Sequence, residues 1–233
     1  NMDAFMALSK KYNIPILEDC AESLFSKYDG KQCGTFGLIN TFSFQATKTI
    51  TTGEGGMVVT DNDEIARKMA LFRSHGMDRN KAFYIHELHG HNFRLTNLQA
   101  AMGVAQFEVK DIIIGERVRV FNEYLKNLEG VSEIKFQKMT PNTEPLVWAV
   151  GLELQGESLI NKRDDMIQEL RKLNIESRPG FYASSLLEIY PKHQLPISEN
   201  ISRSIISLPF YATLRNEDIT YICDKFKTLL NEI

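Results

Sequence analysis

A short apolar run that ends in two acidic residues constrains the fold of this chain more than any other feature. Ile14–Leu17 has the length of a buried strand, and Glu18-Asp19 follow it directly. Further short runs, at 41–44 and 57–60, also have the character of strands. Because ligands of open α/β sheets bind at the carboxyl ends of the strands, acids in this position favour an α/β sheet with a site at its edge.

Helices are expected around these runs, where apolar residues recur at helical spacing. The chain opens with one apolar helix face. Asp61 with Glu64 three residues on offers the N-cap of a second helix, and Thr96 with Gln99 forms the capping box of a third. We expect this third helix to be long, with a break or bend near Gly115.

The dipeptide Glu129-Gly130 marks the expected boundary between two domains, because the pattern of elements restarts after it. A strand is expected over 146–154 and a helix over 162–173, and the chain ends on an amphipathic helix. We therefore expect one domain over residues 1–129 and a second over residues 130–233.

The composition is that of a globular protein in a reducing compartment. The chain has 233 residues and a formal net charge of −3, which argues against a large nucleic-acid surface. No apolar run reaches the ~18 residues that a membrane span needs. The three cysteines, at 20, 33 and 223, leave one unpaired in any disulfide scheme. These features predict a cytoplasmic protein without a membrane or nucleic-acid partner.

Lys48 is the candidate for covalent chemistry. It ends the segment Phe42–Lys48, directly after an expected central strand. A lysine held there is partly desolvated, which favours the neutral amine that attacks a carbonyl. Asp19 ends another strand of the same expected sheet, so both side chains face one site. An imine-forming lysine and a carboxylate are the pair that pyridoxal phosphate needs, because the carboxylate keeps the pyridine nitrogen protonated.

Plainer interpretations of the candidate residues stay open. Asp19 is also a suitable cap of a helix or turn, and Ser43 is also a suitable strand hydroxyl. Asn92 fits a left-handed turn position, and Arg94 fits a surface ion pair. The glycine-rich run 53–56 is interpreted as a hairpin turn, since it lacks the P-loop pattern.

The histidines do not predict a metal site. Four of the five histidines lie at 75, 86, 89 and 91, within a stretch expected to be an irregular loop over 74–93. Their spacing matches no common zinc pattern, and no cysteine lies nearby. No metal ligands are therefore assigned.

Several segments, spread in order over nearly the whole chain, carry a resemblance to a known family. They are Glu18–Ser23, Phe42–Lys48, Lys48–Gly56, Arg73–Gly76, Gly90–Ala101, Arg178-Pro179 and Ile206–Pro209. Together they resemble the DegT/DnrJ/EryC1/StrS sugar aminotransferases, which are pyridoxal-phosphate enzymes of the aspartate-aminotransferase fold. The resemblance implies an α/β protein of fold type I. Residues 1–129 would be the C-terminal portion of a large mixed-sheet cofactor-binding domain, and 130–233 a small α+β domain.

The resemblance also implies a reaction. The Lys48–Gly56 run is most similar to perosamine-synthase-like members, which aminate the C4 ketone of GDP-4-keto-6-deoxymannose with glutamate as amino donor. The implied activity is this amino transfer to a nucleotide-linked sugar, as used in polysaccharide biosynthesis. Two alternatives stay open: a 3-aminotransferase acting on another nucleotide-linked keto sugar, and a non-catalytic fragment or regulatory relative that keeps the fold.

Roles for individual residues follow from the same resemblance. Lys48 would be the Schiff-base lysine and Asp19 the pyridinium partner, which makes these two the catalytic residues. Glu22 would lie beside the cofactor ring near its phenolic oxygen, and Ser43 would bind the cofactor phosphate.

A second group of residues implies a homodimer with shared active sites. Asn92 would reach the phosphate of the neighbouring subunit's cofactor, and Arg94 would face the substrate there. Arg178 is also implied in substrate binding. These expectations make the nucleotide sugar, the amino-acid donor and a second copy of the chain the expected partners.

The chain departs from the family pattern in two places. Full-length relatives have a sizeable region before the first helix, with a phosphate-binding turn at a helix N-terminus and an aromatic ring that stacks on the cofactor. This chain does not contain that region. We expect the remainder to belong to the same protein, and the alternatives are that another chain completes the site or that the polypeptide is inactive. After Arg178-Pro179, Ala183 and Ser185 stand where relatives often have a Pro-x-His contact, which leaves the identity of the sugar open.

Overall fold

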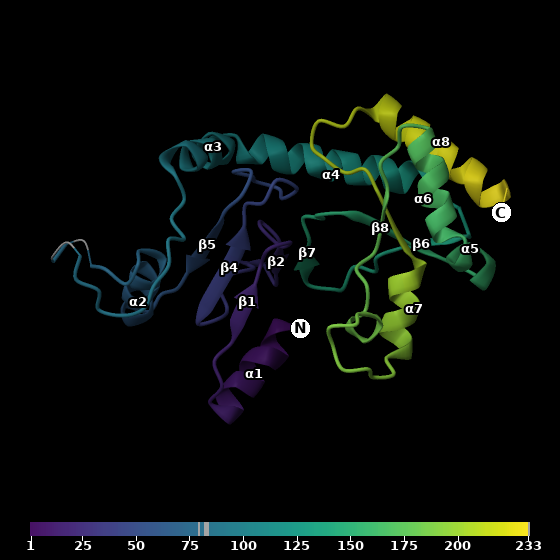
Figure 1. The fold of residues 1–233 in the computed structure, drawn as a ribbon. Helices are drawn as coiled ribbons and strands as arrows, with labels where there is room; N and C mark the ends of the chain where they lie inside the picture. The colour runs from purple at the N-terminus through teal and green to yellow at the C-terminus, as the bar shows by residue number, and fades with distance from the viewer. Residues whose placement is uncertain (79, 82–83, 233) are drawn as a thin grey trace. The chain divides into compact units, whose positions relative to one another are not determined.

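The computed structural model describes residues 1–78, 80–81 and 84–232 (Figure 1). The chain divides into two compact units. Unit 1 comprises Asn1–Ile113 and Pro141–Leu146, and unit 2 comprises Ile114–Thr140 and Val147–Ile233. Each unit is described by itself. The domain boundary at 129/130 stays a prediction.

Unit 1 is built on a three-stranded mixed sheet in the order β1-β4-β5. The strands are β1 (Leu17–Asp19), β4 (Ile39–Ser43) and β5 (Gly56–Val59). β1 pairs with β4 in parallel, and β4 pairs with β5 in antiparallel. A parallel pair needs a crossover connection, and here residues 20–38 supply it. The two strands do form an antiparallel hairpin, but its connection spans residues 44–55 and Gly56 is the first residue of β5, so the run 53–56 ends this connection and does not form the turn by itself.

A second small sheet lies in unit 1. It has the order β3-β2-β7, with β2 (Lys27–Tyr28), β3 (Lys31–Gln32) and β7 (Thr143–Glu144). An ion pair of 3.1 Å joins Lys27 Nζ to Glu144 Oε2 across β2 and β7. This pairing brings residues 141–146 back onto unit 1.

The first two helices of unit 1 are α1 (Met2–Tyr12) and α2 (Asp63–Arg73). The predicted N-cap of α2 was wrong by one residue. Asn62, not Asp61, is the N-cap, and its Oδ1 accepts from the amide of Ile65 at 3.0 Å. The physical reason is the reach of the cap, which must bond the second or third amide of the helix. Both acids that follow, Asp63 and Glu64, lie in the first turn, where the helix dipole favours negative charge.

The long helix that we expected divides into α3 (Asn97–Glu108) and α4 (Lys110–Asn127). The capping box of Thr96 and Gln99 at the start of α3 is confirmed. The break lies at Val109 rather than at Gly115, which sits inside α4. Val109 has φ −110° and ψ 20°, and its amide bonds the carbonyl of Gln106 three residues back. Glycine lowers helix propensity, but that preference is weak and did not decide where the helix breaks.

Unit 2 contains a four-stranded antiparallel sheet in the order β6-β8-β10-β9. The strands are β6 (Ile134–Phe136), β8 (Val150–Leu154), β10 (Ile205–Leu208) and β9 (Arg178–Pro179). β8 is buried at alternate positions, as expected for a strand with one face on a core.

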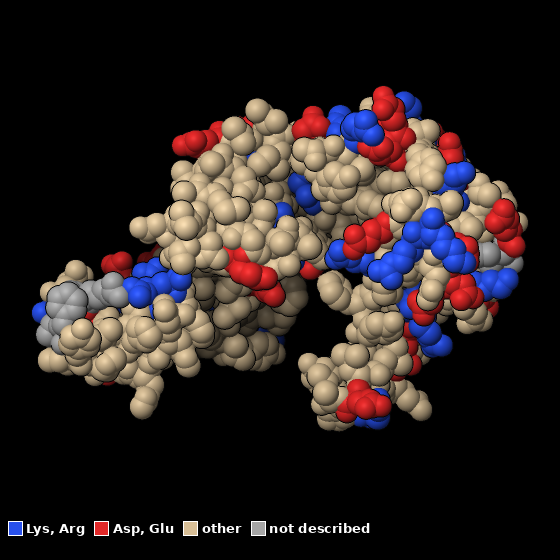
Figure 2. Space-filling model, turned by 45° about the horizontal axis from the view of Figure 1, so that its top comes forward, with Lys and Arg blue, Asp and Glu red and all other residues tan. Residues whose placement is uncertain are grey.

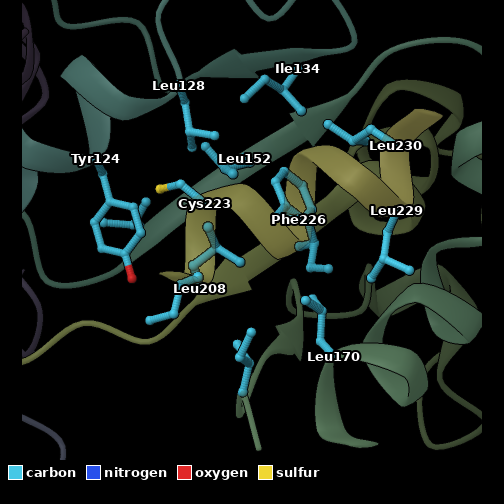
Figure 3. Packing of buried hydrophobic residues seen from close by; sticks show 14 of the residues in the cluster. Tyr124, Leu128, Ile134, Leu152, Leu170, Leu208, Cys223, Phe226, Leu229 and Leu230 are labelled. Atoms are coloured by element: carbon cyan, nitrogen blue, oxygen red, sulfur yellow. The ribbon is translucent and has the colours of Figure 1, made fainter. Parts of the chain in front are cut away.

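Helices pack against this sheet and enclose the core of unit 2 (Figure 3). The unit's helices are the later part of α4, α5 (Glu157–Asn161), α6 (Arg163–Lys172), the short helix Ser184–Leu186, α7 (Pro196–Ser204) and α8 (Asn216–Glu232). The labelled side chains of the core in Figure 3 are Tyr124, Leu128, Ile134, Leu152, Leu170, Leu208, Cys223, Phe226, Leu229 and Leu230. Burial of such side chains contributes roughly 1.5–3 kcal/mol each, so this core is the main source of stability in unit 2.

Two further features concern the charges on the surface and the length and polarity of the helices. On the face shown in Figure 2, basic and acidic side chains are intermingled. Among the described residues, every helix is too short or too polar to cross a lipid bilayer.

Candidate active site

The parallel pairing of β1 and β4 brings two predicted site residues to one edge of the sheet. Asp19 is the last residue of β1 and lies opposite Thr41, and β4 ends two residues later at Ser43. Parallel strands have their carboxyl ends at the same edge, which is where α/β sheets bind ligands. The Asp19 carboxylate is exposed, and its Oδ1 accepts a hydrogen bond of 3.0 Å from the amide of Ala21. The local turn bond that the plainer interpretation proposed is therefore present.

A tight turn after β4 carries Lys48. Ser43 Oγ accepts from the amide of Gln45 at 3.3 Å, and the carbonyl of Gln45 accepts from the amide of Lys48 at 2.9 Å. The side chain of Gln45 closes the same turn, because its Oε1 accepts from the amide of Thr47 at 2.8 Å. These bonds fix the backbone from which the lysine side chain projects.

The lysine side chain is mostly buried and lies against a carboxylate. Its side chain is 13% exposed, and Lys48 Nζ lies 3.3 Å from Glu22 Oε1. The two residues are 26 positions apart, so the ion pair joins the segment after β1 to the segment after β4. A pair of this partial exposure contributes at most about 1 kcal/mol to stability. Its main consequence is chemical, since it holds an amine and a carboxylate together beside the strand ends.

Asn92 and Arg94 form a second group in unit 1. Asn92 forms an isolated antiparallel bridge with Ser74, and its Oδ1 accepts from Arg94 Nε at 3.3 Å. Both side chains are exposed. The expected irregular loop over 74–93 contains residues 79, 82 and 83, which lie outside the described residues.

Arg178 belongs to unit 2, where it begins β9. Its Nη2 donates to Glu176 Oε1 at 2.8 Å, and both side chains are well exposed. Its expected role in substrate binding stays a prediction.

The comparison with known proteins decides the family. The sequence pattern of the DegT/DnrJ/EryC1/StrS aminotransferase family matches residues 1–227. The chain belongs to this family. The aminotransferases of this family depend on pyridoxal phosphate.

Two relatives of this chain illustrate the match to the aminotransferase family. GDP-perosamine synthase of Escherichia coli O157:H7 is 35% identical over 236 residues, which cover 100% of this chain and 63% of the relative. GDP-perosamine synthase of Caulobacter vibrioides is 36% identical over 223 residues, which cover 94% of this chain and 60% of the relative. The chain therefore spans less than two thirds of the length of these relatives.

A solved structure supports the fold. Helicobacter pylori PseC, an aminotransferase involved in the biosynthesis of pseudoaminic acid, matches with a TM-score of 0.93 and 27% identity. The match covers 100% of this chain and 64% of that chain. The mixed α/β architecture and this likeness confirm the predicted fold class, the fold type I of pyridoxal-phosphate-dependent transferases.

Glu18 supports the aminotransferase strand β1 in a way that the sequence analysis missed. Its carboxylate accepts three backbone amides, from Gly34 at 2.8 Å, Phe36 at 2.6 Å and Gly37 at 2.7 Å. These bonds tie β1 to the loop that leads into β4. The sequence did hold a hint of these bonds, since Glu18 precedes Asp19 directly and glycines recur in the loop that follows. We had assigned Glu18 to the strand end and not to contacts with this loop.

Two glutamines of α3 make contacts with a loop that the sequence analysis missed. Gln106 donates from Nε2 to the carbonyl of Thr51 at 2.6 Å and accepts from its amide through Oε1 at 3.1 Å. Gln99 donates from Nε2 to the carbonyl of Glu54 at 3.0 Å. The two glutamines are seven residues apart and share one helix face. They hold the loop that follows Lys48. Their spacing of seven residues, which places both on one helix face, could have predicted that they contact the same segment.

The described part of the chain has no cluster of side chains suited to bind a metal ion. Within residues 1–78, 80–81 and 84–232, no group of three or more His, Cys, Asp or Glu side chains is arranged to hold a metal ion. His86 Nδ1 instead bonds the carbonyl of His75 at 2.6 Å, and the ring of His91 stacks on that of Phe93.

Proposed function

We propose that this chain is part of a pyridoxal-phosphate-dependent aminotransferase that moves an amino group from an amino acid to a nucleotide-linked 4-keto-6-deoxy sugar. The donor is glutamate, and the product class is that of GDP-perosamine synthesis. The observation that carries the proposal is the mostly buried Lys48 amine, 3.3 Å from the Glu22 carboxylate, in the turn that follows β4. The names of the relatives support the substrate class.

The residues at the strand ends fit the cofactor by their chemistry. Lys48 supplies an amine, Asp19 a carboxylate at the end of the neighbouring parallel strand, and Ser43 a hydroxyl at the end of β4. These are the groups needed to bind an aldehyde, a protonated ring nitrogen and a phosphate, respectively. In the proposal Lys48 is the attachment point, Asp19 holds the ring nitrogen protonated, and Ser43 donates to the phosphate.

Lys48 also moves the proton. When bound, the cofactor supplies an aldehyde for the amino group and a ring that takes up an electron pair from the reacting carbon. The amine of Lys48 would act as general base and take the proton from the donor α-carbon. It later returns a proton to C4 of the sugar. Glu22 lies close enough to orient the lysine ammonium between these two transfers.

The proposal includes a homodimer with shared active sites. Asn92 reaches the cofactor phosphate of the partner subunit, and Arg94 faces the substrate there. Large exposed apolar side chains in the same stretch and on α3 support an interface, namely Phe93, Leu98 and Met102. Such exposure on one segment is typical of a protein–protein contact. Arg178 of unit 2 is proposed to bind the substrate.

The proposed location is the cytoplasm. All three cysteines are free thiols, and Cys20 and Cys223 are buried. Unpaired cysteines fit a reducing compartment.

An amino-transfer assay tests the function. The protein is incubated with glutamate and GDP-4-keto-6-deoxymannose, and the product is identified by NMR. We expect amination at C4, and loss of turnover in Lys48→Ala. Lys68→Ala is the matched control, because Lys68 also pairs with a glutamate, at 2.7 Å, but lies exposed on α2. Turnover that survives in Lys48→Ala would overturn the proposal, and amination at C3 would favour the alternative 3-aminotransferase.

A further inference from the structure

A pair of parallel aromatic rings in unit 2 has no part in the site described above. The rings of Trp148 and Phe181 are inclined by only 5°, and their centroids are 6.4 Å apart. With ring planes at the usual contact separation of about 3.5–4 Å, this spacing leaves the rings shifted sideways by on the order of 5 Å. The rings therefore overlap little, and together they form a stepped aromatic surface of two parallel faces. Phe181 is 78% exposed, whereas Trp148 is half-buried.

The backbone at Trp148 is anchored by the buried guanidinium of Arg117. Arg117 Nη2 donates to the carbonyls of Trp148 at 2.8 Å and of Val147 at 3.1 Å. Arg117 is buried and lies 4.6 Å from the ring centroid of Phe210. Burial lowers the pKa of Arg117 to about 10, which still leaves it charged at neutral pH. Hydrogen bonds from a charged donor are the stronger kind, so the position of Trp148 is well fixed.

The segment that carries Phe181 is anchored on both sides. The amide of Gly180 donates to the carbonyl of Ile205 at 3.0 Å, and a Cβ on Gly180 would lie 2.7 Å from Ile205. On the other side, the buried guanidinium of Arg163 lies 5.9 Å from the ring centroid of Tyr182. Close packing at Gly180 and this contact at Tyr182 hold the backbone at Phe181 in place.

We propose that Trp148 and Phe181 form a stacking platform for the nucleobase of the nucleotide-linked substrate. The identity of the ligand rests on the proposed function, and the geometry of the platform does not. A nucleotide-linked sugar consists of a base, a ribose, a diphosphate and a hexose, and only the base is aromatic. Aromatic side chains bind bases by stacking, whichever hydrogen-bonding groups the base carries. A preordered surface binds more tightly than a mobile one, because less conformational entropy is lost. The anchoring of the backbone at Trp148 and Phe181 serves this purpose.

The chain contains a built-in probe for the test. Trp148 is its single tryptophan, so intrinsic fluorescence reports on the platform. The holoprotein is titrated with GMP and, separately, with ribose 5-phosphate, which has the sugar and phosphate but no base. We expect saturable quenching by GMP and none by ribose 5-phosphate. Free N-acetyltryptophanamide, titrated in parallel, corrects for absorbance by the nucleotide.

Two variants and a control keep the test sharp. Equilibrium dialysis of GMP against Phe181→Leu and Trp148→Leu should show binding weakened about 5- to 150-fold, the loss expected when a stacking partner is removed. Phe5→Leu is the control, because Phe5 is also an exposed phenylalanine but lies on α1 of unit 1. Circular dichroism confirms that each variant is folded, and since Phe181 is so exposed, its variant should keep the wild-type spectrum.

The outcomes separate the platform from the proposed function. Unchanged GMP affinity in folded Phe181→Leu, or no GMP binding by a protein that catalyses amino transfer, would overturn the platform and leave the function standing. A change in oligomeric state without a change in GMP affinity would also overturn it, because the rings would then belong to a protein interface. GMP binding that depends on both rings, in a protein without amino-transfer activity, would support the platform and refute the proposed function.

Discussion

Replacing Glu18 by glutamine should loosen the loop that leads into β4. In the wild type, Glu18 Oε2 accepts from the amide of Gly34, and Oε1 accepts from the amides of Phe36 and Gly37, all between 2.6 and 2.8 Å. Glutamine has one acceptor oxygen. If that oxygen keeps the hydrogen bonds from the amides of Phe36 and Gly37, the side-chain NH₂ group of the glutamine lies against the amide of Gly34. Two hydrogen-bond donors then face each other.

The cost can be worked out from these contacts. The buried Gly34 amide loses its acceptor, which costs about 1–3 kcal/mol, and the two remaining bonds lose their charge assistance. The expected total is about 2–4 kcal/mol of local opening free energy. A change of 2 kcal/mol corresponds to exchange that is roughly 30-fold faster, since about 1.4 kcal/mol is a factor of ten.

Hydrogen–deuterium exchange with mass spectrometry measures this effect. Peptides that cover residues 33–38 should exchange at least roughly 30-fold faster in Glu18→Gln. Glu144→Gln is the control in the same unit, because it breaks the exposed pair with Lys27 and should change exchange at 33–38 little. If exchange at 33–38 is the same in Glu18→Gln and wild type, the three bonds do not hold the loop, and this account of Glu18 is wrong.

Three further outcomes are expected. Phe226→Ala removes a fully buried ring from the core of unit 2 and should lower the free energy of unfolding by about 3–5 kcal/mol, measured by urea denaturation followed through tryptophan fluorescence. Gln106→Leu leaves the amide and carbonyl of Thr51 without their side-chain partner and should destabilise the Lys48 loop by about 1–3 kcal/mol, seen as faster amide exchange at residues 49–56. Burial raises the pKa of Cys223 from 9.0 to about 12. Between these two pH values the thiol loses its proton in the unfolded state and keeps it in the folded state. The free energy of unfolding should therefore fall as pH rises from 9 towards 12, and the fall should be smaller in Cys223→Ala.

Local signals in the sequence predicted much of the fold. The capping box of Thr96 and Gln99 is a short-range pattern that needs no tertiary context, and it is confirmed. The first strand was predicted too early and as buried, because β1 is Leu17–Asp19, includes both acids and is largely exposed, but the expected parallel sheet edge is present. The ordered motifs correctly identified the family. The capping box and the motifs succeeded because each depends on residues close together in the chain or on many matches in order.

Features that depend on distant residues were missed. The sheet of β2, β3 and β7 joins residues more than a hundred positions apart through strands of two residues, which are too short to show alternation. The Lys48–Glu22 pair and the three amides on Glu18 likewise depend on how β1 and β4 align. A carboxylate that binds backbone amides has the same sequence as one that faces solvent, so only the structure separates the two.

The position of cofactor attachment tests the central claim most directly. The protein is incubated with pyridoxal phosphate, reduced with borohydride, digested and examined by tandem mass spectrometry. The account predicts one stable adduct, on Lys48 Nζ, and its absence from Lys48→Ala but not from Lys68→Ala. An adduct confined to other lysines, or none in the complete protein, would contradict the assignment of Lys48 as the residue that holds the cofactor.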